Sequence, residues 1–325
     1  MLQTFITKST RWMLGLVCLT LSGLALAQAN ANQPITLIIP YPPGGSADML
    51  ARPMLPDLQK VLGQTIVLDY KGGAGGTIAT SALARAKPDG QTIILILTAH
   101  AINDALYPKL PYDTRKDFAP VSLVATLPLL VAAPLSSPFN TIPELIAFAK
   151  ANPDKLSYAS AGNGNTSHLS VELFKTLTGT KMVHIPYKGS GPAVIAMLGN
   201  EVSFMFDSIS TSFQQVKAGK LKAIAVSSLE RASILPNTPT IAETLPGFEV
   251  TVWYGILAPA GTPEAAINKL SQAFAQVAKD PKVRAQLAES GYATVGSTPA
   301  VFGKHIETEL TKWNKAVKDS GATIQ

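Results

Sequence analysis

Short apolar runs alternate with segments of helical periodicity along most of this chain. The strand-like runs are Ile35–Ile39, Thr65–Leu68, Thr92–Leu97, Val121–Val124, Leu129–Ala132, Ala223–Val226 and Tyr254–Leu257. Uninterrupted apolar runs of this length indicate strands that are buried on both faces of a sheet. Because helical segments separate them, the pattern predicts an α/β fold with a parallel or mixed sheet and helices on both faces.

Three of the predicted helices begin with a threonine and a proline close together, at Thr141, Thr262 and Thr298. Threonine is a favourable N-cap, and proline fits the first turn, where a backbone N–H has no partner inside the helix. In the last two helices, apolar residues recur at intervals of three and four. That spacing predicts one face of each helix packed against the core.

The division into domains follows from length and from the lack of a low-complexity linker in the sequence. The roughly 298 residues that follow residue 27 suit two domains, which ordered strands must then join. We place the crossings near Leu127–Pro128 and Val252–Trp253, so that residues 28–127 and 253–325 form lobe 1 and residues 128–252 form lobe 2. A double crossing of this kind provides a hinge, and the cleft between the lobes is the expected ligand site.

The first 27 residues have the pattern of a cleaved signal peptide. Lys8 and Arg11 precede an apolar core, Trp12–Leu26, and Ala25-Leu26-Ala27 is a small-x-small cleavage site. This pattern predicts export from the cytoplasm; the alternative is an uncleaved membrane anchor, for which the apolar core is short. Removal of the two basic residues lowers the formal net charge from +6 to +4. The remaining basic residues form no stripe, so nucleic-acid binding is not expected.

A glycine-rich loop between the first strand and the first helix is the main candidate for chemistry. Gly44 and Gly45 stand between the strand and a helix for which Ser46 is the predicted N-cap. Unpaired amides and the positive end of the helix dipole at such a helix start bind carboxylates or phosphates. Within this helix, we interpret Asp48 and Arg52 as a brace for the loop, with Asp48 accepting backbone N–H bonds.

Three further loops rich in Gly, Ser or Asn follow strand-like segments, and we expect all four loops to face one cleft. They are Lys71–Thr77, Ser160–His168 and Ile185–Ala193. Two side chains have open alternatives. His168 either donates to a ligand carboxylate or satisfies a neighbouring backbone group. Asp207, at the end of another apolar run, either contacts a ligand amine or hydroxyl or caps the helix that follows.

Enzyme chemistry is not expected. The sequence has no Gly-x-Ser-x-Gly motif, and its single cysteine, Cys18, lies in the predicted signal peptide. The segment Gly73–Ile78 lacks the last glycine of a dinucleotide-binding motif, and no Gly-Lys-Ser/Thr ending is present. The four histidines show no metal-ligand spacing. We therefore predict a binding protein that has no cofactor and no metal.

Several motifs together resemble a known family, the Bug or TctC periplasmic receptors of tripartite tricarboxylate transporters. The motifs are Pro40-Tyr41-Pro42-Pro43-Gly44-Gly45-Ser46-Ala47-Asp48, Gly73-Ala74-Gly75-Gly76, Lys87-Pro88-Asp89-Gly90, Ser160-Ala161-Gly162, Ser167-His168-Leu169, Pro186-Tyr187-Lys188-Gly189 and Trp253-Tyr254-Gly255. The resemblance implies a two-lobe (Venus flytrap) protein of the type II periplasmic-binding class. It also implies that the protein closes on a small organic anion, delivers it to membrane subunits of the transporter, and performs no chemistry itself.

The ligand-binding residues that the resemblance implies lie in both lobes. They are Tyr41, Gly45, Ser46, Ala47, Asp48, Gly75, Gly76, Thr77, Ala161, Thr166, Ser167, His168 and Asp207. We expect a monomer whose ligand is a di- or tricarboxylate or a similar small acid. The alternative functions are that of a ligand sensor that docks on a membrane histidine kinase and that of a secreted hydrolase. Tyr70-Lys71-Gly72 stands where the family often has Asn-Arg-Pro, which leaves the role of that segment open.

Overall fold

The computed structural model of the protein describes residues 33–320, and the predicted signal peptide lies outside them. Within these residues, ten strands form one mixed sheet in the order β2-β1-β3-β9-β4-β7-β5-β6, with β8 and β10 also paired to β4. The strands are β1 (Ile35–Ile39), β2 (Ile66–Tyr70), β3 (Thr92–Leu97), β4 (Phe118–Pro134), β5 (Ser157–Ser160), β6 (Val183–Pro186), β7 (Phe204–Ser208), β8 (Leu221–Val226), β9 (Thr251–Pro259) and β10 (Ala293–Thr294). The predicted α/β class is confirmed.

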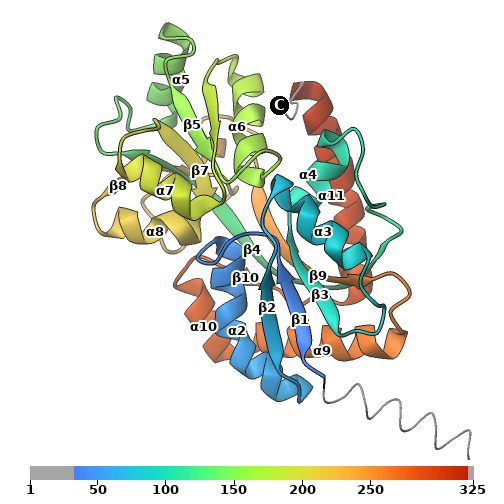
Figure 1. Cartoon of the computed structure of the whole chain (residues 1–325). Helices are drawn as coiled ribbons and strands as arrows, with labels where there is room; N and C mark the ends of the chain where they lie inside the picture. The colour runs from blue at the N-terminus through green and yellow to red at the C-terminus, as the bar shows by residue number, and fades with distance from the viewer. Residues whose placement is uncertain (1–32, 321–325) are drawn as a thin grey trace, which may run out of the picture.

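Helices surround the sheet in both halves of the molecule (Figure 1). They are α2 (Ser46–Leu62), α3 (Thr77–Ala84), α4 (Ala99–Leu106), α5 (Ile142–Ala151), α6 (Thr166–Thr178), α7 (Ser190–Leu198), α8 (Ile209–Lys217), α9 (Glu264–Lys279), α10 (Pro281–Ala288) and α11 (Pro299–Ser320), with short 3₁₀ helices η1 (Ala74–Gly76) and η2 (Ile241–Glu243). No helix within residues 33–320 combines the length and the apolar character that crossing a bilayer requires.

Two of the three predicted threonine caps are present. The Thr141 hydroxyl accepts a hydrogen bond from the backbone N–H of Glu144 at 3.3 Å, and Thr298 accepts one from a first-turn N–H of α11 at 3.4 Å. The prediction is wrong for Thr262, because its hydroxyl donates instead to the carbonyl of Pro259 at 2.7 Å. The Thr262 hydroxyl therefore stabilises the turn that precedes α9 and does not cap the helix.

A single long strand, β4, runs through both halves of the sheet. From Phe118 to Pro128 it pairs antiparallel with β9, and from Leu129 onward it pairs with β7 and β8. The sequence predicts two separate strands here. The structure has one continuous strand, whose two halves pair with different partner strands. We call the part built on β1, β2, β3, β9 and β10 lobe 1 and the part built on β5 to β8 lobe 2. The change of partners at Pro128 supports our proposal that the lobes divide there, with the return crossing in β9.

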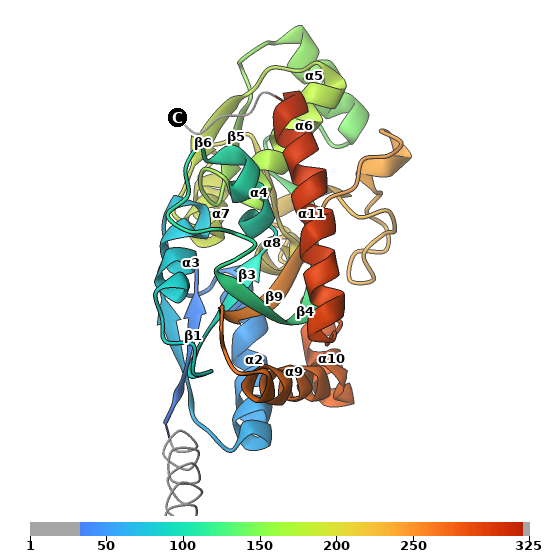
Figure 2. The same ribbon diagram turned by 90° about the vertical axis from the view of Figure 1, so that its right-hand side faces the viewer.

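Helix α11 belongs to lobe 1 but extends along the side of both lobes (Figure 2). It packs on β9 at Gly255, where an added Cβ would lie only 1.9 Å from the ring of Phe302. It is also tied to β9 by Glu309, whose carboxylate accepts from the indole N–H of Trp253 at 2.8 Å and from that of Trp313 at 3.0 Å. Both indoles are almost fully buried. This packing fixes the strand that carries the second crossing.

Candidate functional site

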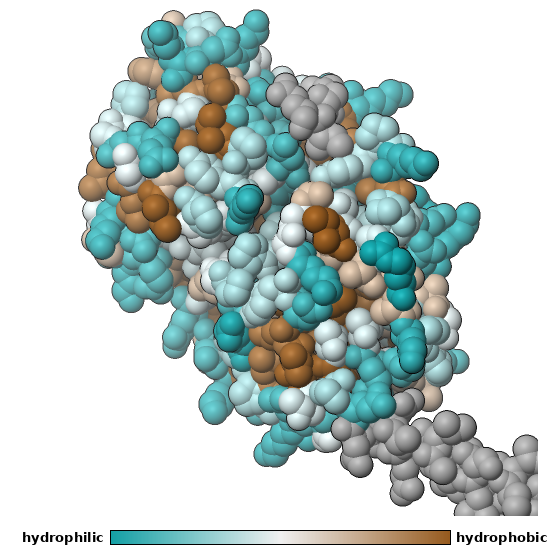
Figure 3. Space-filling model, viewed as in Figure 1, coloured by the Kyte–Doolittle hydropathy of each residue, from teal (hydrophilic) through white to brown (hydrophobic). Residues whose placement is uncertain are grey.

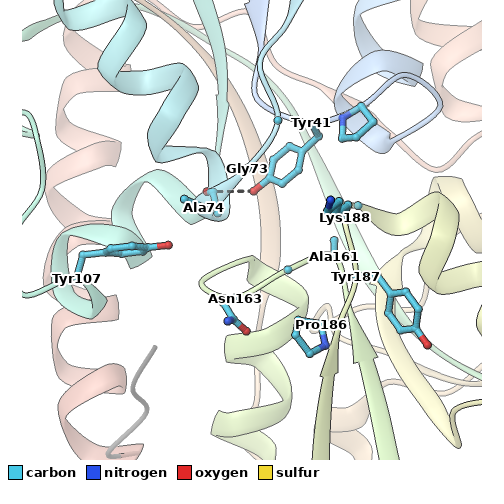
Figure 4. A pocket seen from close by; sticks show the side chains of 14 residues that line it. Tyr41, Gly73, Ala74, Tyr107, Ala161, Asn163, Pro186, Tyr187 and Lys188 are labelled. Atoms are coloured by element: carbon cyan, nitrogen blue, oxygen red, sulfur yellow. Dashed lines mark hydrogen bonds between the residues drawn. The ribbon is translucent and has the colours of Figure 1, made fainter. Parts of the chain in front are cut away.

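Two adjoining cavities lie between the lobes. The outer cavity has a volume of about 690 Å³ and is lined by all four of the predicted loops, with Tyr107 from the end of α4. Its lining comprises Tyr41, Pro42, Gly72, Gly73, Ala74, Gly75, Tyr107, Ala161, Gly162, Asn163, Pro186, Tyr187, Lys188 and Gly189. In Figure 4 the hydroxyl of Tyr107 points into this space, whereas the ring of Tyr187 points away. The expectation that the four loops face one cleft agrees with this lining.

The inner cavity is small, about 20 Å³, and is lined by both hydroxyl-bearing and apolar residues. Its lining comprises Tyr41, Gly45, Ser46, Leu97, Leu129, Ala161, Asn165, Thr166, Ser190, Ser208 and Val252. Because Tyr41 and Ala161 line both cavities, they form the partition between them. The volume is enough for a water molecule or for the oxygens of one carboxylate.

Hydroxyl groups from the two lobes meet in the inner cavity. Ser208 of lobe 2 donates to Ser46 Oγ of lobe 1 at 3.2 Å, and the buried Thr166 Oγ1 has no hydrogen-bond partner among the described residues. The lining includes no Lys, Arg, His, Asp or Glu. Most of the surface between the lobes likewise has intermediate hydropathy rather than a cluster of strongly polar groups (Figure 3). The chemistry of the inner cavity is therefore that of neutral donors near the positive end of the α2 dipole.

The first loop is fixed to α2 by Asp48. The N-cap of α2 is Gly45, without a side-chain bond, so the prediction of Ser46 as N-cap is wrong. Asp48 instead accepts from the N–H of Gly44 at 2.9 Å and from Arg52 Nε at 2.9 Å. It also accepts from the hydroxyl of Tyr70. The Asp48–Arg52 brace is confirmed, and Tyr70 is a third member that sequence reasoning missed.

Electrostatics keep the Asp48 carboxylate charged. Burial raises its pKa, but the hydrogen bonds from Tyr70, Gly44 and Arg52 outweigh that effect, so that the pKa lies below its ordinary value. The same contacts act on Tyr70, where burial and then the bond to Asp48 raise the pKa to about 12. The segment that departs from the family pattern thus begins with a residue of the brace.

The second loop meets lobe 2 at Gly75. Its carbonyl accepts from the hydroxyl of Tyr41 at 3.3 Å (Figure 4) and from Asn103 Nδ2 at 3.0 Å. Gly75 has a positive φ of 61°, and an added Cβ would lie 2.8 Å from the carbonyl oxygen of Asn163 across the cleft. Only glycine combines this backbone conformation with so close an approach.

The third loop is held by its own side chains. The N–H of Ala161 donates to Ser167 Oγ at 2.9 Å, and Ser167 donates in turn to Asn165 Oδ1. His168 Nδ1 accepts from the N–H of Gly164 at 3.3 Å. Of the two alternatives for His168, the structure thus contains the backbone contact.

Asp207 lies at the end of β7 and is fully buried. One carboxylate oxygen accepts from the hydroxyls of Thr211 and Ser212 in the first turn of α8, and the other has no partner among the described residues. Burial raises its pKa, and the hydrogen bonds from Ser212 and Thr211 offset this only in part. Asp207 therefore contacts side chains of the helix start.

The predicted site residues separate into two layers. Those that line a cavity are Tyr41, Gly45, Ser46, Gly75, Ala161 and Thr166. Those that stand behind the lining are Ala47, Asp48, Gly76, Thr77, Ser167, His168 and Asp207; as ligand contacts these stay predictions. Sequence reasoning missed Tyr107, Ser190 and Ser208. Two positions could have indicated the serines, because Ser190 lies in the predicted loop Ile185–Ala193 and Ser208 directly follows Asp207 at the end of an apolar run.

A mixed sheet whose long strand changes partners between two lobes, with a cavity between them that is lined by hydroxyls of both lobes, defines a two-lobe solute-binding protein of the periplasmic type. The family model described as "Tripartite tricarboxylate transporter family receptor" (TctC) matches residues 50–322. The chain belongs to this family, as its motifs predict. Members of the family are substrate-binding receptors rather than enzymes.

Known relatives cover nearly the whole chain. A UPF0065 protein from the tcbD-tcbE intergenic region of a Pseudomonas species is 37% identical over 91% of this chain and 92% of its own length. The periplasmic binding protein BugD has 35% identity and a TM-score of 0.86, covering 90% of this chain and 99% of that one.

Two solved relatives contain carboxylates. An R. palustris protein with adipate has 35% identity and a TM-score of 0.87, covering 90% of this chain and 99% of that one. MatC from Rhodopseudomonas palustris, with bound malate, has 34% identity and a TM-score of 0.84, covering 88% and 99%. These likenesses confirm the two-lobe fold and a solute-binding role.

Proposed function

We propose that this protein, acting as a monomer in the periplasm, captures a small organic dicarboxylate between its lobes. It then delivers the ligand to the membrane subunits of a tripartite tricarboxylate transporter. The observation that carries the proposal is the inner cavity, where hydroxyls of both lobes converge near the start of α2. One carboxylate placed there accepts hydrogen bonds from both lobes at once and so favours the closed form.

The energy available from such contacts is sufficient. A hydrogen bond to a charged group contributes about 1.5–3 kcal/mol, and a micromolar Kd corresponds to about 8 kcal/mol. Three to five such bonds account for micromolar binding without any cationic side chain. The unpartnered hydroxyl of Thr166 is the first donor that we assign to the ligand.

The outer cavity suits the rest of the ligand. Its volume of about 690 Å³ lies within the usual range for small-molecule sites. Lys188 is the one charged residue of its lining and has no ion pair with another described residue. Its ammonium group can attract a second carboxylate, which favours dicarboxylates. The adipate and malate of the two relatives have this chemistry.

Calorimetric titration with malate, adipate and the monoamide of adipate tests the site. We expect a micromolar or lower Kd for at least one dicarboxylate and at least tenfold weaker binding of the monoamide, which keeps the length but loses one charge. Lys188→Met should weaken dicarboxylate binding about threefold, and more at low salt, because the charge is exposed. Lys150→Met, a substitution at an exposed lysine of α5, is the matched control. Failure of every carboxylate to bind would refute the proposal.

Delivery requires its own experiment. Cells that express the two membrane subunits, with or without this protein, are supplied with the labelled ligand. We expect uptake only when the receptor is present, because the membrane subunits recognise the form that the ligand stabilises. Equal uptake in its absence would remove the transport part of the proposal and leave the binding part intact.

A further inference from the structure

Two imidazoles are stacked behind the third loop. His168 of α6 and His184 of β6 have ring centroids 4.0 Å apart and an interplanar angle of 6°. His184 also stacks on Tyr158 of β5, with the ring centroids 4.8 Å apart. His168 is only 5% exposed. Neither histidine lines the outer or the inner cavity between the lobes, so direct contact with a ligand bound there does not explain them.

Each imidazole bonds to the backbone or to a side chain of residues 160–166, here called the 160–166 loop. His168 Nδ1 accepts the N–H of Gly164 at 3.3 Å. His184 Nε2 lies 2.6 Å from Ser160 Oγ, and Ser160 Oγ accepts the N–H of Gly162 at 3.2 Å. Two amides of the loop are therefore held, directly or through one hydroxyl, by the histidine pair.

The held amides flank the residues that meet the ligand. Ala161, between Ser160 and Gly162, lines both cavities, and Thr166 follows Gly164 by two residues and lines the inner one. Gly162 and Gly164 both have positive φ, so the loop has backbone freedom that its hydrogen bonds must restrict. Displacement of either amide would move the loop relative to Ser46 of the opposite lobe.

The contact of His168 requires a neutral imidazole, whereas the contact between His184 and Ser160 is possible with either group as the donor. A nitrogen that accepts an N–H carries no proton, so protonation of His168 Nδ1 would replace the bond to Gly164 by two opposed N–H groups. The charged groups nearby are Glu172 and Lys175, both of α6, and they act in opposite directions on His168. The Tyr158 hydroxyl donates to Glu172, and Lys175 Nζ lies 2.7 Å from the same carboxylate. Glu172 is thus already compensated and leaves the histidines neutral.

The titration of the pair agrees with this geometry. Burial lowers the pKa of His168 to about 4. Burial, followed by the charge of the stacked His168 and of Lys175, lowers the pKa of His184 to about 3. Both side chains are uncharged at neutral pH.

We propose that His168 and His184 are positioning residues, which hold the 160–166 loop in its ligand-binding form, and that this hold requires a neutral imidazole at His168. The inference rests on the proposed carboxylate binding. It assigns to two buried histidines a part in affinity that does not involve contact with the ligand.

Conservative and apolar variants at pH 7.5 provide the first test. His168→Asn keeps an acceptor close to the position of Nδ1, and His184→Gln keeps a polar group close to that of Nε2; neither titrates. We expect affinity for the dicarboxylate within threefold of wild type for both. His168→Leu and His184→Leu remove the contacts and should weaken binding at least tenfold. Equal affinities for the leucine variants and wild type would overturn the proposal.

A pH profile provides the second test, which a purely structural role would not pass. Between pH 7.5 and pH 3.5, wild type should lose about fourfold more affinity than His168→Asn, the factor that one proton with a pKa of about 4 gives. Titration of the ligand itself affects both proteins alike and cancels. Circular dichroism at each pH confines the comparison to folded protein.

The two tests separate this inference from the proposed function. If wild type binds no carboxylate at pH 7.5, the proposed function fails. If wild type binds but its pH profile equals that of His168→Asn, the positioning role fails while the function stands. Should a leucine variant not fold, the pH comparison decides, because it requires only the conservative variant.

Discussion

Replacement of Asp48 by alanine is expected to loosen the first loop and to weaken ligand binding at least tenfold. Asp48 is buried, and its carboxylate accepts from Gly44, Arg52 and Tyr70. The bond to the N–H of Gly44 joins the loop to α2. Its loss costs about 1.5–3 kcal/mol if counted as a bond to a charged group, and about 1.4 kcal/mol already corresponds to a tenfold change in Kd.

The cost to stability is smaller than the number of contacts suggests. The side chain of Arg52 is 56% exposed, and an ion pair of that exposure contributes at most about 1 kcal/mol. Water can also replace part of the bonds to Gly44 and Tyr70. We therefore expect the free energy of unfolding to fall by about 2–3 kcal/mol, mainly through the bonds from Tyr70 and Gly44.

Calorimetry at pH 7.5, with urea denaturation of the same samples, measures both effects. The matched control is Asp57→Ala, which removes the same charge from the same helix. The side chain of Asp57 has neither a hydrogen bond nor an ion pair with any residue in the described part of the chain. Affinity that is unchanged in a folded Asp48→Ala protein, or reduced equally in the control, would refute the role of the brace.

Three further changes test other parts of the structure. Gly75→Ala should weaken binding at least tenfold, because its Cβ would meet the carbonyl of Asn163 across the cleft. Gly179→Ala, at a similar positive φ with nothing within 4 Å, should leave affinity unchanged, and equal effects on Kd would contradict this reasoning. Gly255→Ala should lower the free energy of unfolding by about 1–3 kcal/mol through overpacking against α11, as measured in urea; a neutral result would mean that the helix shifts freely. Burial lowers the pKa of His100 to about 4, so the unfolded chain takes up a proton between pH 6.5 and 4 that the folded chain does not. The free energy of unfolding should therefore fall as the pH falls through that window, and less steeply in His100→Leu. If the urea midpoints of wild type and variant change equally with pH, His100 makes no such contribution.

The sequence predicts the framework well where local patterns decide it. The run Thr92–Leu97 matches β3 in full, because it is apolar from Ile93 onward and follows the turn residues Asp89 and Gly90. The two apolar runs on either side of Pro128 were separable by pattern alone, yet they form one strand. What joins them is pairing with strands far away in the sequence, which no local signal contains.

Within the site, sequence patterns identify loops better than they identify atoms. The four loops that they select line one cavity. Which side chain caps, braces or faces the ligand depends on contacts over long sequence distances, such as that of Tyr70 with Asp48. Ser167 is an example: its position in the loop suggests a ligand contact, but its hydroxyl accepts the N–H of Ala161 and lines neither cavity.

The two indoles that share Glu309 give this receptor a built-in optical reporter. Trp253 and Trp313 are the tryptophans of the described residues, and both are shielded from solvent. Soluble quenchers should hardly reduce their fluorescence while the protein is folded. Trp253 lies on β9, the strand of the return crossing, and its partner carboxylate lies on α11. A shift in emission on adding ligand would therefore report bending of that strand against the helix, and closure could be followed in real time without an attached dye.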